Sequence, residues 1–173
     1  MRLPNGPDYL IEPLGLHHDR AAFCCGVEAL DNYFQRQAGQ DARKYVAAPF
    51  VLIDRSSGNI AGFYTLSAMS IHLGELPSEI TKKLKLPKYP ALPATLLGRL
   101  AVNEIYRGRG LGERLLMDAL YRSWQNEIAT MAMVVDAKDD SARSFYEHYE
   151  FIRFPDAPNR LFLPMVTIAK LFA

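Results

Sequence analysis

Leu96-Leu97-Gly98-Arg99-Leu100-Ala101-Val102 leads through Asn103–Tyr106 into Arg107-Gly108-Arg109-Gly110-Leu111-Gly112, and this stretch decides the fold. Its apolar first part predicts a buried strand over Thr95–Val102, and the glycines that follow predict a turn. A helix is then expected from about Leu111 to Ile128, with another strand at Ala132–Asp136. The helix has one apolar face, made of Leu111, Leu115, Leu116, Ala119 and Leu120. The order strand–turn–helix–strand is typical of α/β proteins.

The glycine-rich turn has the features of a pyrophosphate-binding site. Backbone N–H groups at the start of a helix lack intrahelical partners, and the helix dipole adds partial positive charge there. Gly108, Gly110 and Gly112 carry no Cβ atom that would keep a phosphate from the backbone, and Arg107 and Arg109 can add charge-assisted hydrogen bonds. The turn has neither the Lys-Ser/Thr of a P-loop nor the G-x-G-x-x-G spacing of dinucleotide-binding folds. The alternative is a surface turn whose glycines only cap a helix; the flanking strand and amphipathic helix favour the binding site.

The remaining segments predict strands and helices in mixed order, and therefore one α/β domain over residues 1–173 with a mixed sheet. No internal repeat, low-complexity segment or Gly/Ser-rich linker divides the chain. Strands are expected at Tyr9–Leu14, Phe50–Ile53, Ile60–Met69, Phe151–Phe154 and Arg160–Pro164, with turns at Ser56–Asn59 and Asp156–Asn159. Helices are expected at Ala22–Gln40, at Ser78–Leu86 as a short helix or turn, and at Ala142–Tyr149 behind an N-cap at Asp140-Ser141, with Pro87, Pro90 and Pro93 as breaks.

Composition and charge narrow the class of protein. Of the 173 residues, 49% are hydrophobic and 23% are charged, as in folded globular proteins, and the net charge of +1 means that any basic surface comes from local clustering. No run of 18 apolar residues is present, so we expect no membrane-spanning helix. The adjacent Cys24 and Cys25 cannot form an unstrained disulfide, and Met1–Pro7 has no apolar stretch of signal-peptide type. We therefore expect a cytoplasmic protein without membrane contact.

Arg107-x-x-Gly110-x-Gly112 resembles the signature Q/R-x-x-G-x-G/A of the GNAT superfamily of N-acetyltransferases, and the likeness covers residues 95–155 well. The resemblance implies the GNAT fold, with a mixed, mainly antiparallel central sheet flanked by helices, and acetyl-CoA as co-substrate. It also implies that the backbone of Leu100, Ala101 and Val102 pairs with the pantetheine arm. The N–H groups of the turn would hold the pyrophosphate, and these belong to Arg107, Gly108, Arg109, Gly110, Leu111 and Gly112.

A second segment, Ser144-Phe145-Tyr146-Glu147-His148-Tyr149-Glu150-Phe151, resembles the A-x-x-F-Y-x-x-x-G-F segment of the same superfamily. The resemblance implies that Phe145 is a cofactor-binding residue and that Tyr146 donates a proton to the departing CoA thiolate. A phenol suits this role because it can donate without being charged, and a thiolate with a pKa of about 8.5 leaves more readily when protonated. Glu150 departs from the pattern, which has Gly there. Without the glycine-rich turn, Tyr146 and Tyr149 would be ordinary half-buried aromatic residues.

The N-terminal residues narrow the family further. Phe23–Phe34, Gln40-Asp41, Tyr45-Val46 and Leu97–Val102 resemble the corresponding segments of TacT-type toxins. This resemblance implies acetyl transfer to the free α-amine of aminoacyl-tRNA, which blocks translation. It also implies a homodimer, a ribbon-helix-helix antitoxin as partner, and contact with DNA only through the antitoxin complex, which acts as a repressor.

Other polar residues allow separate hypotheses. Arg99 lies in an otherwise apolar strand beside the expected acetyl-CoA stretch, so we hypothesise that it binds the acceptor end of tRNA. Lys82, Lys83, Lys85 and Lys88 form one basic cluster and Arg36, Arg43 and Lys44 another; each could meet phosphates or simply be solvated. No metal is expected, because metal-type spacing is absent around His17, His18, His72 and His148.

Two other functions stay open at this point. One is a GNAT enzyme that acetylates a small amine or a protein N-terminus. The other is a binding subunit that works mainly in an antitoxin–DNA repressor complex, with little catalysis.

The α-amine of aminoacyl-tRNA is a chemically suitable acceptor. An α-amine has a pKa of about 8, against about 10.4 for lysine, so a useful fraction is neutral at pH 7 and the acceptor needs no strong general base.

Overall fold

The computed structural model describes residues 7–173, so Met1–Gly6, which carry part of the localisation argument, lie outside the described residues. The chain forms two compact units. The first contains the residues up to Ser67 together with Gly98–Arg122, and the second contains Ala68–Leu97 together with Ser123–Ala173. Within the described range, no helix has the length and apolar character that a membrane crossing requires. The expectation of one domain stays a prediction.

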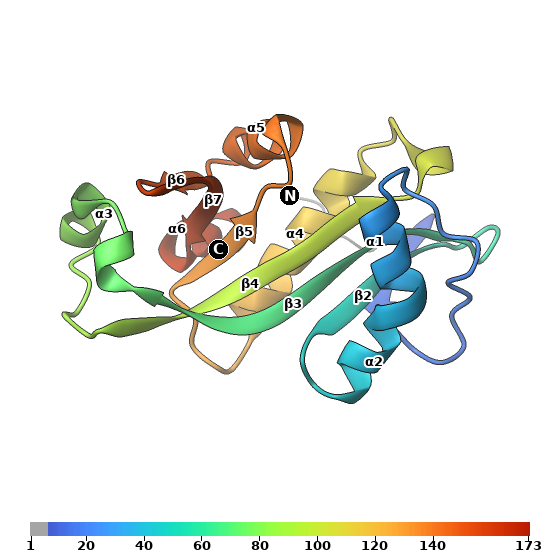
Figure 1. Ribbon diagram of the computed structural model, residues 1–173, viewed down its shortest axis with the longest axis horizontal. Coiled ribbons are helices and arrows are strands. Elements are labelled where there is room, and N and C mark those ends of the chain that lie inside the picture. The colour runs from blue at the N-terminus through green and yellow to red at the C-terminus, as the bar shows by residue number, and fades with distance from the viewer. Residues whose placement is uncertain (1–6) are drawn as a thin grey trace. The chain divides into compact units, whose positions relative to one another are not determined.

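The strands of residues 7–173 hydrogen-bond in the order β1-β2-β3-β4-β5-β7-β6 (Figure 1). Antiparallel pairs are β1 with β2, β2 with β3, β5 with β7 and β6 with β7, whereas β4 and β5 are parallel. This confirms the predicted α/β class with a mixed, mainly antiparallel sheet. The strands are β1 (Tyr9–Pro13), β2 (Ala48–Asp54), β3 (Ile60–His72), β4 (Ala91–Val102), β5 (Ala132–Asp136), β6 (Ile152–Phe154) and β7 (Ala157–Pro164).

Helices connect the strands and differ in type and length. Those of the described chain are α1 (Glu28–Asn32), the π-helix η1 (Tyr33–Gln37), α2 (Ala38–Arg43), the 3₁₀ helix η2 (Leu73–Glu75), α3 (Ser78–Lys83), the 3₁₀ helix η3 (Glu104–Tyr106), α4 (Leu111–Gln125), α5 (Asp140–His148) and α6 (Met165–Phe172). The predicted apolar face of α4 is confirmed, because its leucines are at most 2% exposed. The helix ends at Gln125 and not at Ile128, which is 76% exposed. The helix α6 was not predicted; an apolar run of this length fits a strand as well as a helix.

The first unit contains the predicted hairpin of β2 and β3, and β1 pairs with β2 on its other side. Its core is aromatic: the rings of Phe23, Phe34 and Phe63 meet with centroid distances of 4.3–5.4 Å. Phe34 lies in η1, between α1 and α2, and Phe63 lies in β3, so this cluster fixes the N-terminal helical segment on the strands (Figure 1).

The helix predicted over Ala22–Gln40 is wrong at both ends. Helical structure begins at Glu28, and the preceding backbone is irregular, with Gly26 at φ +87°. Phe23 and Cys25 are 2% and 6% exposed, so burial of these two side chains holds the irregular segment against the core. The helical structure also continues past Gln40 to Arg43.

In the second unit, β4, β7 and the N-cap of α5 begin at residues other than those predicted. Strand β4 begins at Ala91 and not at Thr95, because Pro93 is accommodated in it; the Pro93 carbonyl accepts a hydrogen bond from the Met131 N–H (2.8 Å). Strand β7 begins at Ala157, so the turn after β6 is shorter than predicted. The N-cap of α5 is Asp139, whose carboxylate accepts from the Ala142 N–H at 2.8 Å, and not Asp140-Ser141.

Candidate active site

The turn before α4 has the backbone geometry of an anion-binding site. Gly108 and Gly110 have φ of +79° and +73°, left-handed conformations that side chains disfavour. A Cβ atom added to either glycine would meet no heavy atom within 4 Å, so this side of the turn is open. The first hydrogen bond of the helix joins the Arg114 N–H to the Gly110 carbonyl at 3.3 Å. The N–H groups of residues 111–113 come before this bond and therefore have no partner within the helix. The turn therefore offers backbone donors at the positive end of a helix dipole.

Tyr106 and Asp54 fix this turn from the hairpin side. The Tyr106 hydroxyl donates a hydrogen bond to Asp54 Oδ2 at 2.6 Å, and the Tyr106 side chain is buried. Asp54 also accepts from the hydroxyls of Ser56 and Ser57. The bond from Tyr106, followed by those from the serines, lowers the pKa of Asp54 to about 2. The carboxylate thus stays ionised, and anchors Tyr106, down to strongly acidic pH.

The irregular segment before α1 holds the turn on another side. The Glu104 N–H bonds to the Cys24 carbonyl at 2.9 Å, and Arg107 Nη2 donates to the Cys25 carbonyl at 2.6 Å. A Cβ atom on Gly26 would lie 2.7 Å from Arg107 Nη2, so the glycine leaves room for the guanidinium. Arg107 Nη2 is thus engaged by the protein backbone, and the predicted contact of Arg107 with a pyrophosphate stays a prediction.

Arg109, the second arginine of the turn, is exposed but oriented. Its Cζ lies 4.9 Å from the centroid of the Tyr106 ring, and its Nη1 lies 3.4 Å from the Tyr9 hydroxyl. The hydrogen bond to Tyr9 is the main cause that raises the pKa of Arg109. A cation therefore stays close to the turn, although its role toward a ligand is still a prediction.

Strand β4 carries the three residues expected to pair with pantetheine. Ala101 is 6% exposed, and Leu100 and Val102 are half-buried. A Cβ atom on Gly62 of β3 would lie 2.9 Å from the Ala101 carbonyl oxygen, so the missing side chain lets the two strands approach closely. This contact fixes the end of β4 from which the turn departs; which of its atoms meet a ligand stays a prediction.

Tyr146 lies near the end of α5 in the second unit, where the helix closes with a Schellman motif. The Phe151 N–H bonds to the Tyr146 carbonyl at 3.2 Å, and the Glu150 N–H bonds to the Glu147 carbonyl at 3.0 Å. Glu150 is left-handed, with φ +70°. The superfamily pattern has Gly at this position, so this chain makes the same kind of helix end with a residue that costs roughly 1–2 kcal/mol there.

Ring contacts and burial hold the Tyr146 side chain in place. It is 8% exposed, and its ring meets those of Phe145 and Phe151 at centroid distances of 5.2 and 5.4 Å. Burial raises the pKa of Tyr146, so the hydroxyl keeps its proton well above neutral pH. No residue of 7–173 forms a hydrogen bond with this hydroxyl. The proton is therefore available for a ligand.

Arg99, which the sequence placed near a substrate, stacks on an aromatic ring of the first unit. Its Cζ lies 3.5 Å from the centroid of the Tyr33 ring, and the arginine is half-buried. Tyr33 in turn donates a hydrogen bond to Asp41. The structure thus gives Arg99 a fixed orientation.

Comparison with known proteins decides the family. The family model for an acetyltransferase (GNAT) domain matches residues 48–153. The chain belongs to the GNAT family of acetyltransferases. The probable toxin TacT of Sinorhizobium fredii (strain NBRC 101917 / NGR234) is 33% identical over 172 residues, which cover 94% of each protein. The tRNA-acetylating toxin of Mycobacterium tuberculosis (strain ATCC 25618 / H37Rv) is 34% identical over 149 residues, which cover 85% of this chain and 86% of that protein.

Solved structures share the fold of this GNAT chain. AtaT complexed with acetyl-methionyl-tRNAfMet has a TM-score of 0.86 and 29% identity, covering 96% of this chain and 100% of that chain. AtaTR bound with acetyl-CoA has a TM-score of 0.83 and 29% identity, covering 96% and 99%. An AtaT variant bound to the C-terminus of the antitoxin AtaR has a TM-score of 0.82 and 25% identity, also covering 96% and 99%. The predicted GNAT fold and N-acetyltransferase class are confirmed.

Some residues that support this GNAT site lie outside its sequence motifs and were not predicted. Asp54 and Tyr106 brace the turn, and the only available signals were the polar cluster after Asp54 and the position of Tyr106 next to Arg107. Tyr33 and Asp41 orient Arg99, and no sequence pattern connects residues so far apart in the chain.

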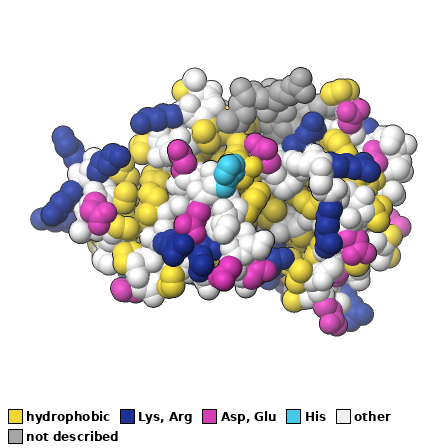
Figure 2. Space-filling view, turned by 90° about the horizontal axis from the view of Figure 1, so that it is seen from above, with side chains coloured by type: hydrophobic (Ala, Val, Ile, Leu, Met, Phe, Trp, Pro, Cys, Tyr) yellow, Lys and Arg dark blue, Asp and Glu magenta, His cyan; other side chains and the backbone are white. Residues whose placement is uncertain are grey.

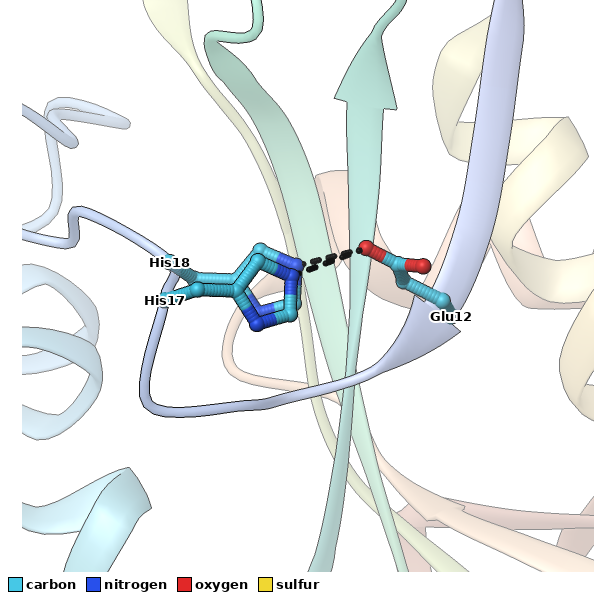
Figure 3. Close-up of side chains that lie close together, drawn as sticks. All are labelled: Glu12, His17 and His18. Carbon is cyan, nitrogen blue, oxygen red and sulfur yellow. Dashed lines mark hydrogen bonds and ion pairs between the residues drawn. The ribbon is translucent and has the colours of Figure 1, made fainter.

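Two of the histidines that are scattered in the sequence, His17 and His18, lie beside Glu12 in the structure. Glu12 Oε1 lies 2.7 Å from His18 Nε2 and 3.6 Å from His17 Nε2 (Figure 3), and one ligand-type atom of each lies within 4.8 Å of the others. The Gly15 N–H donates to His18 Nδ1 at 2.8 Å, so the neutral ring carries its proton on Nε2 and donates it to Glu12. A cation at Nε2 would have to displace that proton. The group is therefore better explained as a clamp on the loop after β1 than as a metal site.

Charged side chains of both signs are interspersed on the face of the GNAT chain drawn in Figure 2. The residues of both predicted basic clusters are exposed: Lys82, Lys83, Lys85 and Lys88 in the second unit, and Arg36, Arg43 and Lys44 in the first. Whether they meet phosphates stays a prediction.

Proposed function

We propose that this GNAT enzyme acetylates the α-amine of aminoacyl-tRNA and thereby blocks translation as a toxin. The observation that carries the proposal is the turn Arg107–Gly112, where two left-handed glycines present backbone N–H groups at the start of the 15-residue helix α4. Similarity to a tRNA-acetylating toxin over 85% of the chain supports this acceptor, as does the likeness to AtaT, which was solved with acetyl-methionyl-tRNAfMet.

Acetyl-CoA is the acetyl donor in this proposal, and no metal takes part. Its diphosphate suits the open side of the turn beside Gly108 and Gly110, where nothing stands in place of a Cβ atom. The N–H groups of the turn would hold the diphosphate, the backbone of Leu100–Val102 would pair with the pantetheine arm, and Phe145 would pack against it. The helix dipole of α4 adds positive charge where the diphosphate needs it.

Acetyl-CoA, when bound, supplies an acetyl group as a thioester. The amine nitrogen forms the C–N bond while the C–S bond breaks, so the amine loses one proton and the sulfur gains one. Tyr146 holds the proton for the sulfur at its hydroxyl, where burial keeps the phenol protonated at neutral pH. The α-amine, with a pKa of about 8, needs no strong base to be partly neutral at pH 7. Arg99 binds the acceptor end of the tRNA.

We also propose the assembly that goes with this activity. The enzyme forms a homodimer in the cytoplasm, binds a ribbon-helix-helix antitoxin, and contacts DNA only through that complex, which acts as a repressor. The likeness to an AtaT variant bound to the C-terminus of the antitoxin AtaR supports such a partner. Both units work as one acetyltransferase domain over residues 1–173. Light scattering on the purified protein, alone and with the product of a neighbouring reading frame, measures both associations.

The decisive experiment incubates purified protein with acetyl-CoA and a pool of charged tRNA, and identifies acetylated aminoacyl ends by mass spectrometry. We expect acetylation by the wild type and a loss of about 100-fold or more in Tyr146→Phe, because general acid catalysis contributes about 10²–10⁴-fold. Tyr149→Phe, in the same segment, is the matched control and should retain activity. Acetyl-CoA binding without acetylated tRNA would reject the acceptor and favour a small amine or a protein N-terminus. Unchanged acetylation in Tyr146→Phe would reject the proton donor alone.

A further inference from the structure

Arg99 is fixed by a buried aromatic platform in the first unit. Its guanidinium carbon lies 3.5 Å from the centroid of the Tyr33 ring, which is close enough for face-to-face stacking. Tyr33 is only 8% exposed, and its ring stacks on Phe63 with a centroid distance of 6.3 Å and an interplanar angle of 24°. The guanidinium therefore continues a stack that begins in the core.

Asp41 keeps the platform from turning. The Tyr33 hydroxyl donates to Asp41 Oδ2 at 2.9 Å, and Gln37 Nε2 donates to Asp41 Oδ1, also at 2.9 Å. Both carboxylate oxygens are thus engaged by neutral donors. Tyr33 and Gln37 begin and end the π-helix η1, a rare local structure that is frequent at functional sites. The π-helix places the ring of Tyr33 under Arg99 and the amide of Gln37 beside Asp41.

The guanidinium N–H groups of Arg99 are not used within the protein. Among residues 7–173, no carbonyl, hydroxyl or carboxylate oxygen accepts a hydrogen bond from them, and the side chain is half-buried with one face covered by Tyr33. A guanidinium held flat in this way presents its donors in a plane, as a fork that matches two oxygens of one anion. Because its orientation is already set, little side-chain entropy is lost when an anion binds.

We infer that Tyr33 is a positioning residue that presents Arg99 to a phosphodiester of the tRNA acceptor strand. This inference rests on the proposed function and adds the group that is bound and the residues that orient its receptor. The carboxylate of the amino acid is esterified in aminoacyl-tRNA, so the anions nearest the reacting amine are the phosphodiesters of the 3′ end. A guanidinium at this strand therefore has a phosphodiester as its partner.

The diphosphate of acetyl-CoA is a different anion and has a different receptor. Arg99 precedes Val102 by roughly 10 Å of extended strand, and the glycine-rich turn begins only after Asn103–Tyr106. Arg99 and Ala101 lie on the face of β4 that packs on the N-terminal helical segment, as the contacts with Tyr33 and the aromatic core indicate. The two anion sites therefore have separate residues and can be tested separately.

The test measures binding of charged tRNA at salt concentrations between 50 and 200 mM, with steady-state kinetics at one of them. A single-stranded phosphate contact contributes about 0.7 to the slope of log Kd against log salt concentration. We expect Arg99→Gln to raise Kd and KM for charged tRNA about tenfold and to lower this slope by about 0.7, with kcat and acetyl-CoA affinity nearly unchanged. Tyr33→Leu, which removes the platform, should lose about three- to tenfold in Kd, whereas Tyr33→Phe, which keeps the ring, should restore most of it.

Lys170→Gln is the control for net charge, because Lys170 is exposed and belongs to neither basic cluster. Equal losses in Lys170→Gln and Arg99→Gln would overturn the inference, since they would show that only net charge matters. A wild-type salt slope in Arg99→Gln, or weaker acetyl-CoA binding in place of weaker tRNA binding, would overturn it as well. If the wild type acetylates no aminoacyl-tRNA, the proposed function fails; if it does and only the Arg99 and Tyr33 results are negative, this inference alone fails.

Discussion

At the scale of single residues, the site depends on side chains whose protonation is set by their neighbours. Tyr146 is surrounded by aromatic rings, and burial keeps its proton in place. Asp54, in contrast, lies in a polar environment. Three hydroxyls donate hydrogen bonds to its carboxylate and stabilise the charged form. One hydroxyl thus keeps its proton at neutral pH, and the carboxylate stays ionised and braces the turn.

Asp54 predicts how stability depends on pH. Its pKa is about 2 in the folded protein against an ordinary 3.8, so the ionised form is favoured by folding. The stabilisation is fully present above about pH 4 and is lost as the pH falls through 2. Melting temperatures of wild type and Asp54→Asn should therefore differ above pH 4 and converge toward pH 2. Tyr106→Phe, which removes the first donor, should reproduce most of the effect. A constant difference down to pH 2 would show that Asp54 acts through packing alone.

Glu150 predicts a stabilising substitution. Its φ of +70° disfavours any residue with a Cβ atom, whereas Gly adopts it freely. Part of the relieved strain is offset by the greater freedom of Gly in the unfolded chain, so Glu150→Gly should raise the free energy of unfolding by about 0.5–1 kcal/mol. Urea denaturation measures this change, and Glu150→Ala, which keeps the Cβ atom, should show no such gain. A loss of stability in Glu150→Gly would mean that the Glu150 side chain itself stabilises the helix end.

At the scale of elements, a single substitution in the glycine-rich turn tests whether this turn binds the diphosphate of acetyl-CoA. Gly110→Ala places a Cβ atom on the open side and strains the backbone, so acetyl-CoA affinity should fall about tenfold or more. Gly58→Ala is a matched control, because Gly58 has φ +77° and open space as well but lies in the β2–β3 turn. Calorimetric titration should find weaker binding only in Gly110→Ala. Equal affinity in both variants would show that the turn does not hold the diphosphate.

The helices and strands also show which parts of the fold could be predicted from the sequence. The helix α4 and the strand β5 could be predicted because their hydrophobic patterns are local in the sequence. The glycines likewise indicate the turn from the sequence alone. The irregular segment at 22–27 could not be predicted as such, because burial of Phe23 and Cys25 against residues from elsewhere in the chain overrides its helical pattern. The stack of Arg99 on Tyr33 and the brace of Tyr106 on Asp54 are likewise contacts that only the tertiary fold creates.

At the scale of the whole molecule, the two compact units are joined by more than a linker. The strands β3 and β4 and the helix α4 each begin in one unit and end in the other, at Ser67/Ala68, Leu97/Gly98 and Arg122/Ser123. To unfold one unit alone would require breaking β3 and β4 in their interior and α4 in its last turn, where backbone hydrogen bonds are lost. This continuity favours the proposal of one domain over that of two independent ones.

One cooperative unfolding transition is therefore expected, with calorimetric and van't Hoff enthalpies that agree. Leu115 in the first unit and Leu163 in the second are 0% and 1% exposed, so Leu115→Ala and Leu163→Ala should each destabilise by about 2–5 kcal/mol. If the units unfold together, each substitution lowers the same melting temperature and leaves the transition single. If they unfold separately, each substitution moves only part of the heat-absorption curve, and the single-domain proposal fails. Differential scanning calorimetry of the wild type and the two variants distinguishes these outcomes, because a transition confined to one unit would carry only part of the unfolding enthalpy.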